Sequence, residues 1–141
     1  WGTLVNVQAN LVFPLYTFGG LSDGMKAHDY NIETKIADKN IRLNGIAPQK
    51  FSVKKGNLVA GIKERYDLVV ANILTQVIYN LLEDIEKILT DKAIFICSGI
   101  LEKNENLVIA KMKTIGFDIL DLCIKDQWVA IAGRYTKRRR A

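Results

Sequence analysis

The sequence predicts an α/β fold with a mainly parallel sheet and an antiparallel hairpin at its end. Strand-like and helix-like segments alternate along most of the 141 residues, which is the pattern of strands joined by helical crossovers. Residues 67–71 (DLVVA) are apolar enough for a strand buried on both faces, as parallel strands are. Residues 117–124 and 127–134 are both strand-like, and only Lys125 and Asp126 separate them. Because so short a connection cannot be a crossover, these two strands are expected to pair as a hairpin.

The first elements are short. Residues 3–7 (TLVNV) indicate a first buried strand. Residues 11–21 have no clear assignment, because one proline and two glycines weaken a helix there. Residues 25–29 indicate a short second strand that ends on Asp29.

A helix is predicted after this second strand. Asn31 can cap its first turn, and Gly45 suits the left-handed residue that follows a last turn. Its apolar stripe consists of Ile32, Ile36, Ala37 and Ile41. Residues 50–54 (KFSVK) then alternate in polarity, which predicts a third strand.

The most regular predicted helix follows the fourth strand. Its apolar residues recur at spacings of three and four: Leu74, Val77, Ile78, Leu81, Leu82, Ile85, Ile88 and Leu89. Residues 93–97 (AIFIC) indicate a fifth strand, and residues 102–115 a helix that Gly116 stops. No internal repeat and no linker-like segment occurs in the sequence, so residues 1–141 are interpreted as one domain.

Most of the net charge comes from the end of the chain. Residues 137–140 (KRRR) supply four of the net +5, and without them 16 basic residues face 15 acidic ones. This basic tail is either a solvated end or a contact for RNA or a ribosomal surface. No apolar run approaches the roughly 20 residues that span a bilayer, and residues 1–10 do not resemble a signal peptide.

The two cysteines indicate no special chemistry. Cys97 and Cys123 lie in apolar, strand-like runs, so both are expected to be buried thiols in a reducing compartment such as the cytoplasm. His28 is the only histidine and no C-x-x-C occurs, so a zinc site has too few of its usual ligands. No metal site is expected.

Candidate ligand-binding residues follow the strands, because ligands of open parallel sheets bind beyond the carboxyl ends of the strands. Asp29 ends the second strand, where a carboxylate can accept hydrogen bonds from two ribose hydroxyls or simply precede a helix. Asn72 follows the fourth strand. Its carboxamide can accept a hydrogen bond from an amine and donate one to an oxygen, or it can cap the helix that follows.

Several segments resemble one family. Residues 66–74 (YDLVVANIL), 98–101 (SGIL), 116–119 (GFDI) and 127–134 (QWVAIAGR) resemble the PrmA-type ribosomal-protein (large-subunit protein eleven) methyltransferases. Residues 31–46 (NIETKIADKNIRLNGI) are similar to the helix after strand two in that family, which also ends in asparagine-glycine. The resemblance covers residues 29–134 and implies the Rossmann-like fold of S-adenosylmethionine-dependent methyltransferases.

The resemblance implies transfer of a methyl group from S-adenosylmethionine to amino groups of a ribosomal protein. In that pattern Asp29 would bind the ribose, and Asn57 stands where the family usually has an aspartate near the adenine. Asn72 would hold the methionyl end of the cofactor and orient the incoming amine. The sulfonium is already activated, so the protein needs to supply little more than a close approach and a neutral amine.

The first 28 residues depart from the family's pattern. The family has a G-x-G-x-G loop after its first strand, whereas here Gln8, Asn10 and Val12 occupy the glycine positions. Gln8 is therefore the cofactor-binding candidate in this divergent loop. The family's amino-terminal recognition domain is also missing from the sequence. An alternative is therefore a degenerate, non-catalytic module of the same fold that contacts ribosomal protein or RNA.

Overall fold

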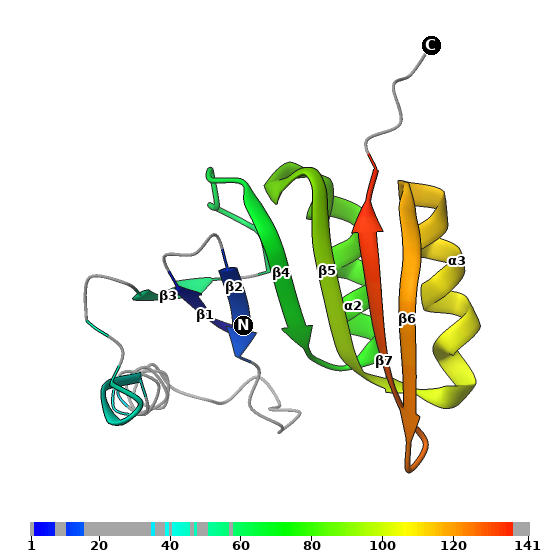
Figure 1. Ribbon diagram of the computed structural model, residues 1–141, viewed down its shortest axis with the longest axis horizontal. Helices are drawn as coiled ribbons and strands as arrows, with labels where there is room; N and C mark the ends of the chain where they lie inside the picture. The colour runs from blue at the N-terminus through cyan, green and yellow to red at the C-terminus, as the bar shows by residue number, and fades with distance from the viewer. Residues whose placement is uncertain are drawn as a thin grey trace, which may run out of the picture.

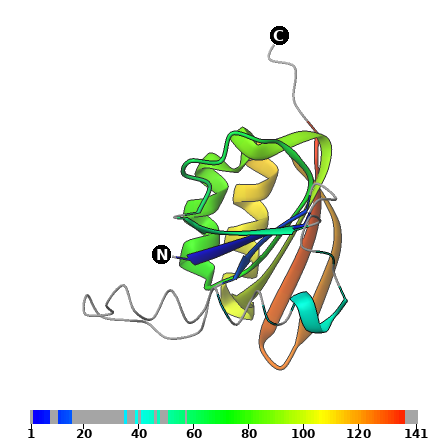
Figure 2. The same cartoon turned by 90° about the vertical axis from the view of Figure 1, so that its left-hand side faces the viewer.

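The computed structural model describes residues 2–7, 11–15, 35, 39, 41–45, 47, 51–56 and 58–136. Within these residues the strands form a seven-stranded sheet in the order β3-β1-β2-β4-β5-β7-β6 (Figure 1). The strands are β1 (Gly2–Val7), β2 (Leu11–Leu15), β3 (Phe51–Gly56), β4 (Tyr66–Asn72), β5 (Leu89–Leu101), β6 (Phe117–Lys125) and β7 (Trp128–Tyr135). The helices α2 (Thr75–Asp84) and α3 (Glu105–Ile115) lie together on one face of this sheet (Figure 2).

Both predicted helices of the carboxyl-terminal half are confirmed. α2 (Thr75–Asp84) continues into the 3-10 turn η2 (Ile85–Ile88), so the apolar period that predicted one helix extends through two joined elements. The turn η3 (Glu102–Asn104) leads into α3 (Glu105–Ile115). Gly116 ends α3 with a φ of 113°, and its N–H donates to carbonyl oxygens of the last turn.

Part of the predicted first helix lies within the described residues. Residues 41–43 are helical. Gly45 has a φ of 69°, and its N–H donates to the Arg42 carbonyl oxygen at 3.0 Å. The expected left-handed glycine at the end of this helix is therefore confirmed. Asn31, its predicted cap, lies outside the described residues.

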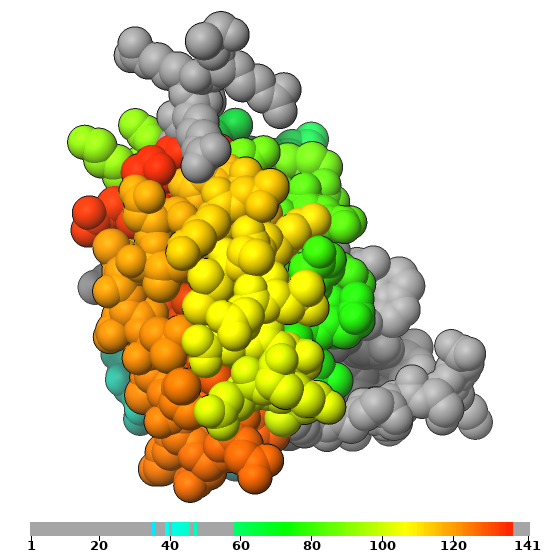
Figure 3. All heavy atoms as spheres, turned by 90° about the vertical axis from the view of Figure 1, so that its right-hand side faces the viewer, coloured from blue at the N-terminus to red at the C-terminus, as the bar shows by residue number. Residues whose placement is uncertain are grey.

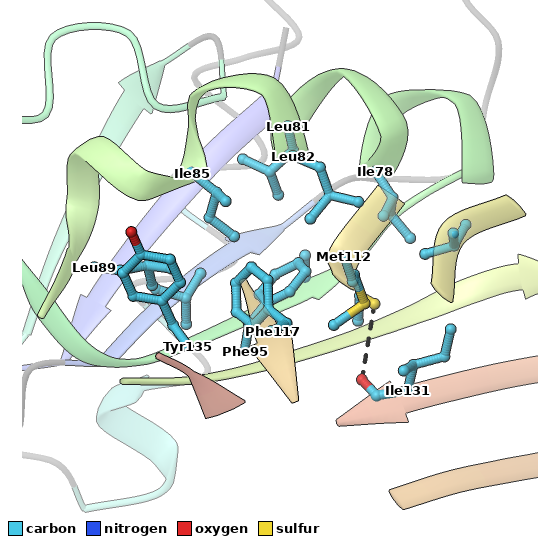
Figure 4. Close-up of a cluster of buried hydrophobic side chains, with 14 of the residues drawn as sticks. Ile78, Leu81, Leu82, Ile85, Leu89, Phe95, Met112, Phe117, Ile131 and Tyr135 are labelled. Atoms are coloured by element: carbon cyan, nitrogen blue, oxygen red, sulfur yellow. Dashed lines mark hydrogen bonds between the residues drawn. The ribbon is translucent and has the colours of Figure 1, made fainter. Parts of the chain in front are cut away.

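The core lies between the sheet and the pair α2 and α3. Figure 4 shows side chains of α2 pointing toward aromatic rings that the strands contribute. The ring of Phe117 lies 5.8 Å from that of Phe95 and 5.4 Å from that of Tyr135, measured between centroids. Met112 of α3 is fully buried beside them. The apolar face of α2 is thus buried as its period predicts, and the ring contacts add to that burial.

The prediction of a mainly parallel sheet fits only in part, because the sheet is mixed. Only the pairs β2–β4 and β4–β5 are parallel among the described strands, and the other four pairs are antiparallel. β1 and β2 are joined by residues 8–10 alone, which is too short for a crossover, so the two strands pair antiparallel. Residues 11–15, which the sequence left unassigned, are the strand that brings this pair beside β4.

The terminal hairpin is confirmed. β6 and β7 pair antiparallel from Phe117↔Tyr135 to Lys125↔Trp128. The turn residues are Asp126 and Gln127, with φ values of 50° and 68°. Two consecutive positive φ values are typical of the two-residue turns whose twist matches paired strands.

The two cysteines differ in exposure, so the prediction that both are buried is wrong for Cys123. Cys97 of β5 is fully buried beneath the helices, and its Sγ contacts the Ile131 carbonyl oxygen at 3.7 Å. Cys123 is exposed because it lies on β6, the last strand of the sheet, which forms a flank of the molecule beside α3 (Figure 3). Neither cysteine forms a disulfide.

No helix in the described ranges has both the length and the apolar character that a membrane span requires.

Candidate functional site

The candidate site lies where β4 and β5 end side by side. The two strands are parallel and in register to their last pair, Asn72↔Ser98. One residue further, the Ile73 N–H donates to the Ser98 carbonyl oxygen at 3.2 Å. The segments ANIL and SGIL, which carried the resemblance, are therefore in contact at the carboxyl edge of the parallel strands, where α/β sheets bind ligands.

Asn72 is the last residue of β4, and its side chain is exposed. It is not the helix cap that its position also allowed. α2 begins at Thr75, its N-cap is Leu74, and no side chain hydrogen-bonds to the cap. In the part of the chain that the structure describes, the Asn72 carboxamide therefore has no partner in the helix and can bind an external group.

Gly99 brings β5 unusually close to Asn72. Its φ is +83°, a conformation that residues with a side chain rarely adopt. A Cβ atom on Gly99 would lie 2.5 Å from the Ile73 carbonyl oxygen and 3.3 Å from Asn72 Oδ1. The oxygen of the Asn72 carboxamide thus packs against a position that has no side chain.

Hydrogen bonds connect the start of α2, the end of β5 and the turn between β6 and β7 at this edge. The Thr75 hydroxyl oxygen accepts from the Leu101 N–H at 3.2 Å, which ties the start of α2 to the end of β5. The Gln127 carbonyl oxygen accepts from the Glu102 N–H at 2.9 Å, which ties β5 to the hairpin turn. An open groove of about 460 Å³ lies beside them, lined by Leu101, Glu102, Lys103 and Gln127.

The other predicted site residues, Gln8, Asp29 and Asn57, lie outside the described residues, so their side chains are not placed. Gly56, which precedes Asn57, pairs with Gly2. β3 runs in the direction of β4, so its end faces the same edge of the sheet as Asn72.

β1, which ends just before Gln8, runs in the direction opposite to β3 and β4. Val7 pairs with Leu11, and Leu11 pairs with Leu68 near the start of β4. The end of β1 is thus at the edge opposite Asn72. Val12, expected at a glycine position of a cofactor loop, lies inside β2 and pairs with Asn6 and Val69.

Neither a metal site nor the buried thiol offers an alternative chemistry among the described residues. They contain no group of three or more His, Cys, Asp or Glu side chains that could hold a metal ion. Burial raises the pKa of the Cys97 thiol to about 12, so this sulfur stays protonated and is a poor nucleophile at neutral pH. Asn72 presents an exposed carboxamide at the ligand-binding edge, beside Ser98.

The sequence led to Asn72 and to residues 98–100 after the fifth strand, but it assigned Gly99 no role of its own. SGIL was singled out for its place after the fifth strand and for its resemblance to a family motif. A glycine directly after an apolar run is a local signal for a bulge or a close backbone approach, and it could have drawn attention to this position.

Comparison with known proteins agrees with the motifs. The profile of the family described as ribosomal protein L11 methyltransferase (PrmA) matches residues 24–136. The ribosomal protein L11 methyltransferase of Desulfosudis oleivorans is 36% identical over 107 residues, and that of Caldicellulosiruptor bescii is 35% identical over 105 residues. Each alignment covers 74% of this chain, but the chain spans only about a third of each relative, 35% and 34%.

Solved structures agree on the fold. The ribosomal protein L11 methylase of Lactobacillus delbrueckii subsp. bulgaricus superposes with a TM-score of 0.67 and 25% identity, over 72% of this chain and 52% of that one. An S-adenosylmethionine-dependent O-methyltransferase from Thermotoga maritima superposes with a TM-score of 0.63 at 13% identity, over 79% of this chain and 49% of that one. The second likeness concerns the fold alone.

The profile match covers most of the sequence, and it includes β4, β5 and the hairpin, whose ends form the candidate site. The chain belongs to the ribosomal protein L11 methyltransferase (PrmA) family.

Proposed function

We propose that this chain is the methyl-transferring part of an S-adenosylmethionine-dependent enzyme that methylates amino groups of a ribosomal protein. The observation that carries the proposal is the exposed carboxamide of Asn72 at the joined ends of β4 and β5. Family membership supports the reaction, and the names of the relatives support a ribosomal protein as the substrate. Nothing in the comparisons favours the alternative of a non-catalytic module.

The chemistry of the residues at this edge fits the cofactor. S-adenosylmethionine supplies a methyl group on a positively charged sulfur, which is already activated for transfer. The protein must hold the methionyl amino and carboxyl groups and admit a neutral amine. An exposed carboxamide provides one acceptor and two donor hydrogens for this purpose, and neither role requires ionisation.

Asn72 has two roles in this proposal. Its NH₂ group donates to the methionyl end of the cofactor. Its Oδ1 accepts a hydrogen bond from the incoming amine, which orients the nitrogen lone pair toward the methyl group. The open groove lined by Leu101 and Glu102 lies at the end of β5, and the acceptor enters through it in this proposal.

The remaining cofactor contacts belong to the same proposal. Asp29 binds the ribose, and Asn57 lies near the adenine. The direction of β3 supports Asn57, because Gly56 faces the same edge of the sheet as Asn72. The direction of β1 argues against a contact from Gln8, because Val7 ends at the opposite edge.

We further propose that residues 1–141 act as one domain, located in the cytoplasm where ribosomal proteins are found. The basic residues 137–140 lie outside the described range and would contact RNA or the ribosomal surface. A contact of this kind weakens as the salt concentration rises.

The test measures binding and transfer separately. Thermal unfolding is recorded with and without millimolar S-adenosylmethionine, since a ligand that binds only the folded state stabilises it. Methyl transfer is then followed with a labelled cofactor and purified ribosomal proteins. Asn72→Ala should lower kcat/KM by roughly 10- to 100-fold, which corresponds to the loss of about one hydrogen bond to a charged group.

The matched control is Asn106→Ala, which removes an exposed asparagine of α3. It should leave both measurements unchanged. A folded parent protein that gains no stability from millimolar cofactor would contradict the proposed function. Equal activity of the Asn72→Ala variant and the parent would contradict the role of Asn72.

A further inference from the structure

We propose that Gly99 is a positioning residue, and that the bulge it forms in β5 holds the Asn72 carboxamide in the orientation that methyl transfer requires. This inference rests on the proposed function. Gly99 itself touches neither the cofactor nor the amine in this account. It acts through the side chain of Asn72.

The pairing of β5 with β7 shows the bulge. Cys97 pairs with Ile131 and Ile100 pairs with Val129, so β5 advances three residues while β7 advances two. The extra residue lies at Ser98–Gly99, directly after the last parallel pair with β4. Gly99 takes the positive φ that bulges of one type require. Bulges often lie beside active sites, where they redirect a neighbouring group.

Gly99 in the bulge lies against the backbone of Ile73 and the side chain of Asn72. A Cβ atom on Gly99 would meet the Ile73 carbonyl oxygen at 2.5 Å and the carbonyl carbon at 3.1 Å. Ile73 has little freedom to withdraw, because its side chain is buried and its N–H is bonded to the Ser98 carbonyl oxygen. A Cβ atom at Gly99 would therefore push apart the backbones at the ends of β4 and β5. Asn72, which precedes Ile73, would move with them, and its Oδ1 would itself be only 3.3 Å from that Cβ.

Two other glycines show that Gly99 is more than a turn residue. Gly61 has nearly the same φ, +82°, but a Cβ there would meet nothing within 4 Å. Gly133 of β7 is crowded, since a Cβ there would lie 2.7 Å from Met112 Cε, but that contact is in the core. Gly99 combines a positive φ, crowding by backbone atoms and contact with Asn72.

The experiment compares Gly99→Ala with Gly61→Ala and Gly133→Ala. Gly61→Ala forces a side chain into a positive φ without any steric contact. Gly133→Ala introduces a steric contact in the core, with Met112 and Phe117 rather than Asn72. Each variant is assayed for methyl transfer at a temperature at which it is folded. We expect Gly99→Ala to lower kcat at least tenfold, while the two controls stay within about twofold of the parent, since a misplacement of about 1 Å can cost on the order of 100-fold.

A double-mutant cycle separates positioning from general damage. If Gly99 acts through Asn72, then Gly99→Ala should reduce the remaining activity of the Asn72→Ala variant by no more than about twofold. Independent multiplication of the two losses would overturn the inference. So would a Gly99→Ala variant as active as the Gly61→Ala control.

A measurement on the parent protein covers the case in which Gly99→Ala does not fold. The mobility of the Asn72 side-chain NH₂ group is measured by NMR relaxation, with the exposed Asn106 as reference. We expect an ordered carboxamide at Asn72 and a mobile one at Asn106, with an order parameter below about 0.6 for the latter. Equal mobility of the two would overturn the inference, whereas absence of methyl transfer by the parent would overturn the proposed function instead.

Discussion

Gly133→Ala tests how tightly α3 packs on the sheet. Gly133 lies on β7 beneath Met112, and an added Cβ would be 2.7 Å from Met112 Cε and 3.3 Å from Phe117 Cδ1. Carbon atoms in favourable contact are about 3.5–4.0 Å apart, so the methionine methyl group must move by roughly 1 Å. The Phe117 ring has little room to yield, because it lies between the rings of Phe95 and Tyr135.

The magnitude follows from two opposing terms. Overpacking of a well-filled core costs about 1–3 kcal/mol, and the flexible end of Met112 favours the lower part of that range. Gly133 does not have a positive φ, so alanine also restricts the unfolded chain, which stabilises by about 0.4–1 kcal/mol. The free energy of unfolding should therefore fall by about 1 kcal/mol in urea titrations, without a change in the slope m.

Met112→Leu provides the matched rescue. Leucine is shorter than methionine at this position, and the single exchange should cost less than about 1.5 kcal/mol. If Met112 is the obstacle, the cost of the double variant with Gly133→Ala should be smaller than the sum of the single costs by about 1 kcal/mol. Strict additivity, or a Gly133→Ala variant as stable as the parent, would refute the packing argument.

Three further predictions concern the buried and exposed polar groups. Under native conditions at pH 8, an alkylating reagent should modify Cys123 and leave Cys97 intact, and mass spectrometry of a Cys123→Ser variant should show no adduct. Burial raises the pKa of the Cys97 thiol from 9.0 to about 12, so the unfolded state loses this proton first and stability should fall as the pH rises from 9 to 12. The slope attributable to Cys97 is at most about 1.4 kcal/mol per pH unit, and urea titrations of Cys97→Ala should show a flatter pH dependence than the parent; an unchanged pH dependence would contradict this assignment. Tyr135→Phe removes the hydroxyl that donates to Glu86 Oε1 at 2.8 Å and should lower the free energy of unfolding by about 1 kcal/mol, and an unchanged urea midpoint would count against that bond.

The sequence was sufficient for the elements that have a clear period or a short connection. The apolar spacing of α2 identified both the helix and the face that it buries. The two residues between the last strands fixed their antiparallel pairing, because no crossover fits such a length. In both cases a single local property determines the outcome.

The direction of β1 was missed because strand patterns carry no direction. Alternating or buried residues indicate that Gly2–Val7 is a strand, but its partners decide whether it pairs parallel or antiparallel. The proline in residues 11–15 obscured the second strand of the pair, and with it the short connection at residues 8–10. The rule that identified the terminal hairpin applies here as well once β2 is recognised.

The exposure of Cys123 was also missed, and the role of Asn72 was left open, since both depend on tertiary surroundings. Cys123 lies in an apolar run, yet it is exposed because β6 is the last strand of the sheet. Asn72 precedes a helix, yet the helix begins three residues later, at Thr75. Apolar neighbours and capping preferences indicate which residue types suit a position. Where a strand or helix ends then decides which role the residue fills.

The candidate site shows where a glycine is needed in this chain. The sequence directed attention to the absent glycines at positions 8–12, because cofactor loops of this family require close backbone approach. The structure shows close approach at a different place, the bulge at Gly99, where a Cβ would be 2.5 Å from the Ile73 carbonyl oxygen. Hydrogen bonds from Ile73 and Leu101 hold the two strand ends together around that glycine. The β4–β5 edge therefore has a close backbone approach that depends on its own glycine. The described start of the chain meets this edge at β2, where Leu15 pairs with Asn72.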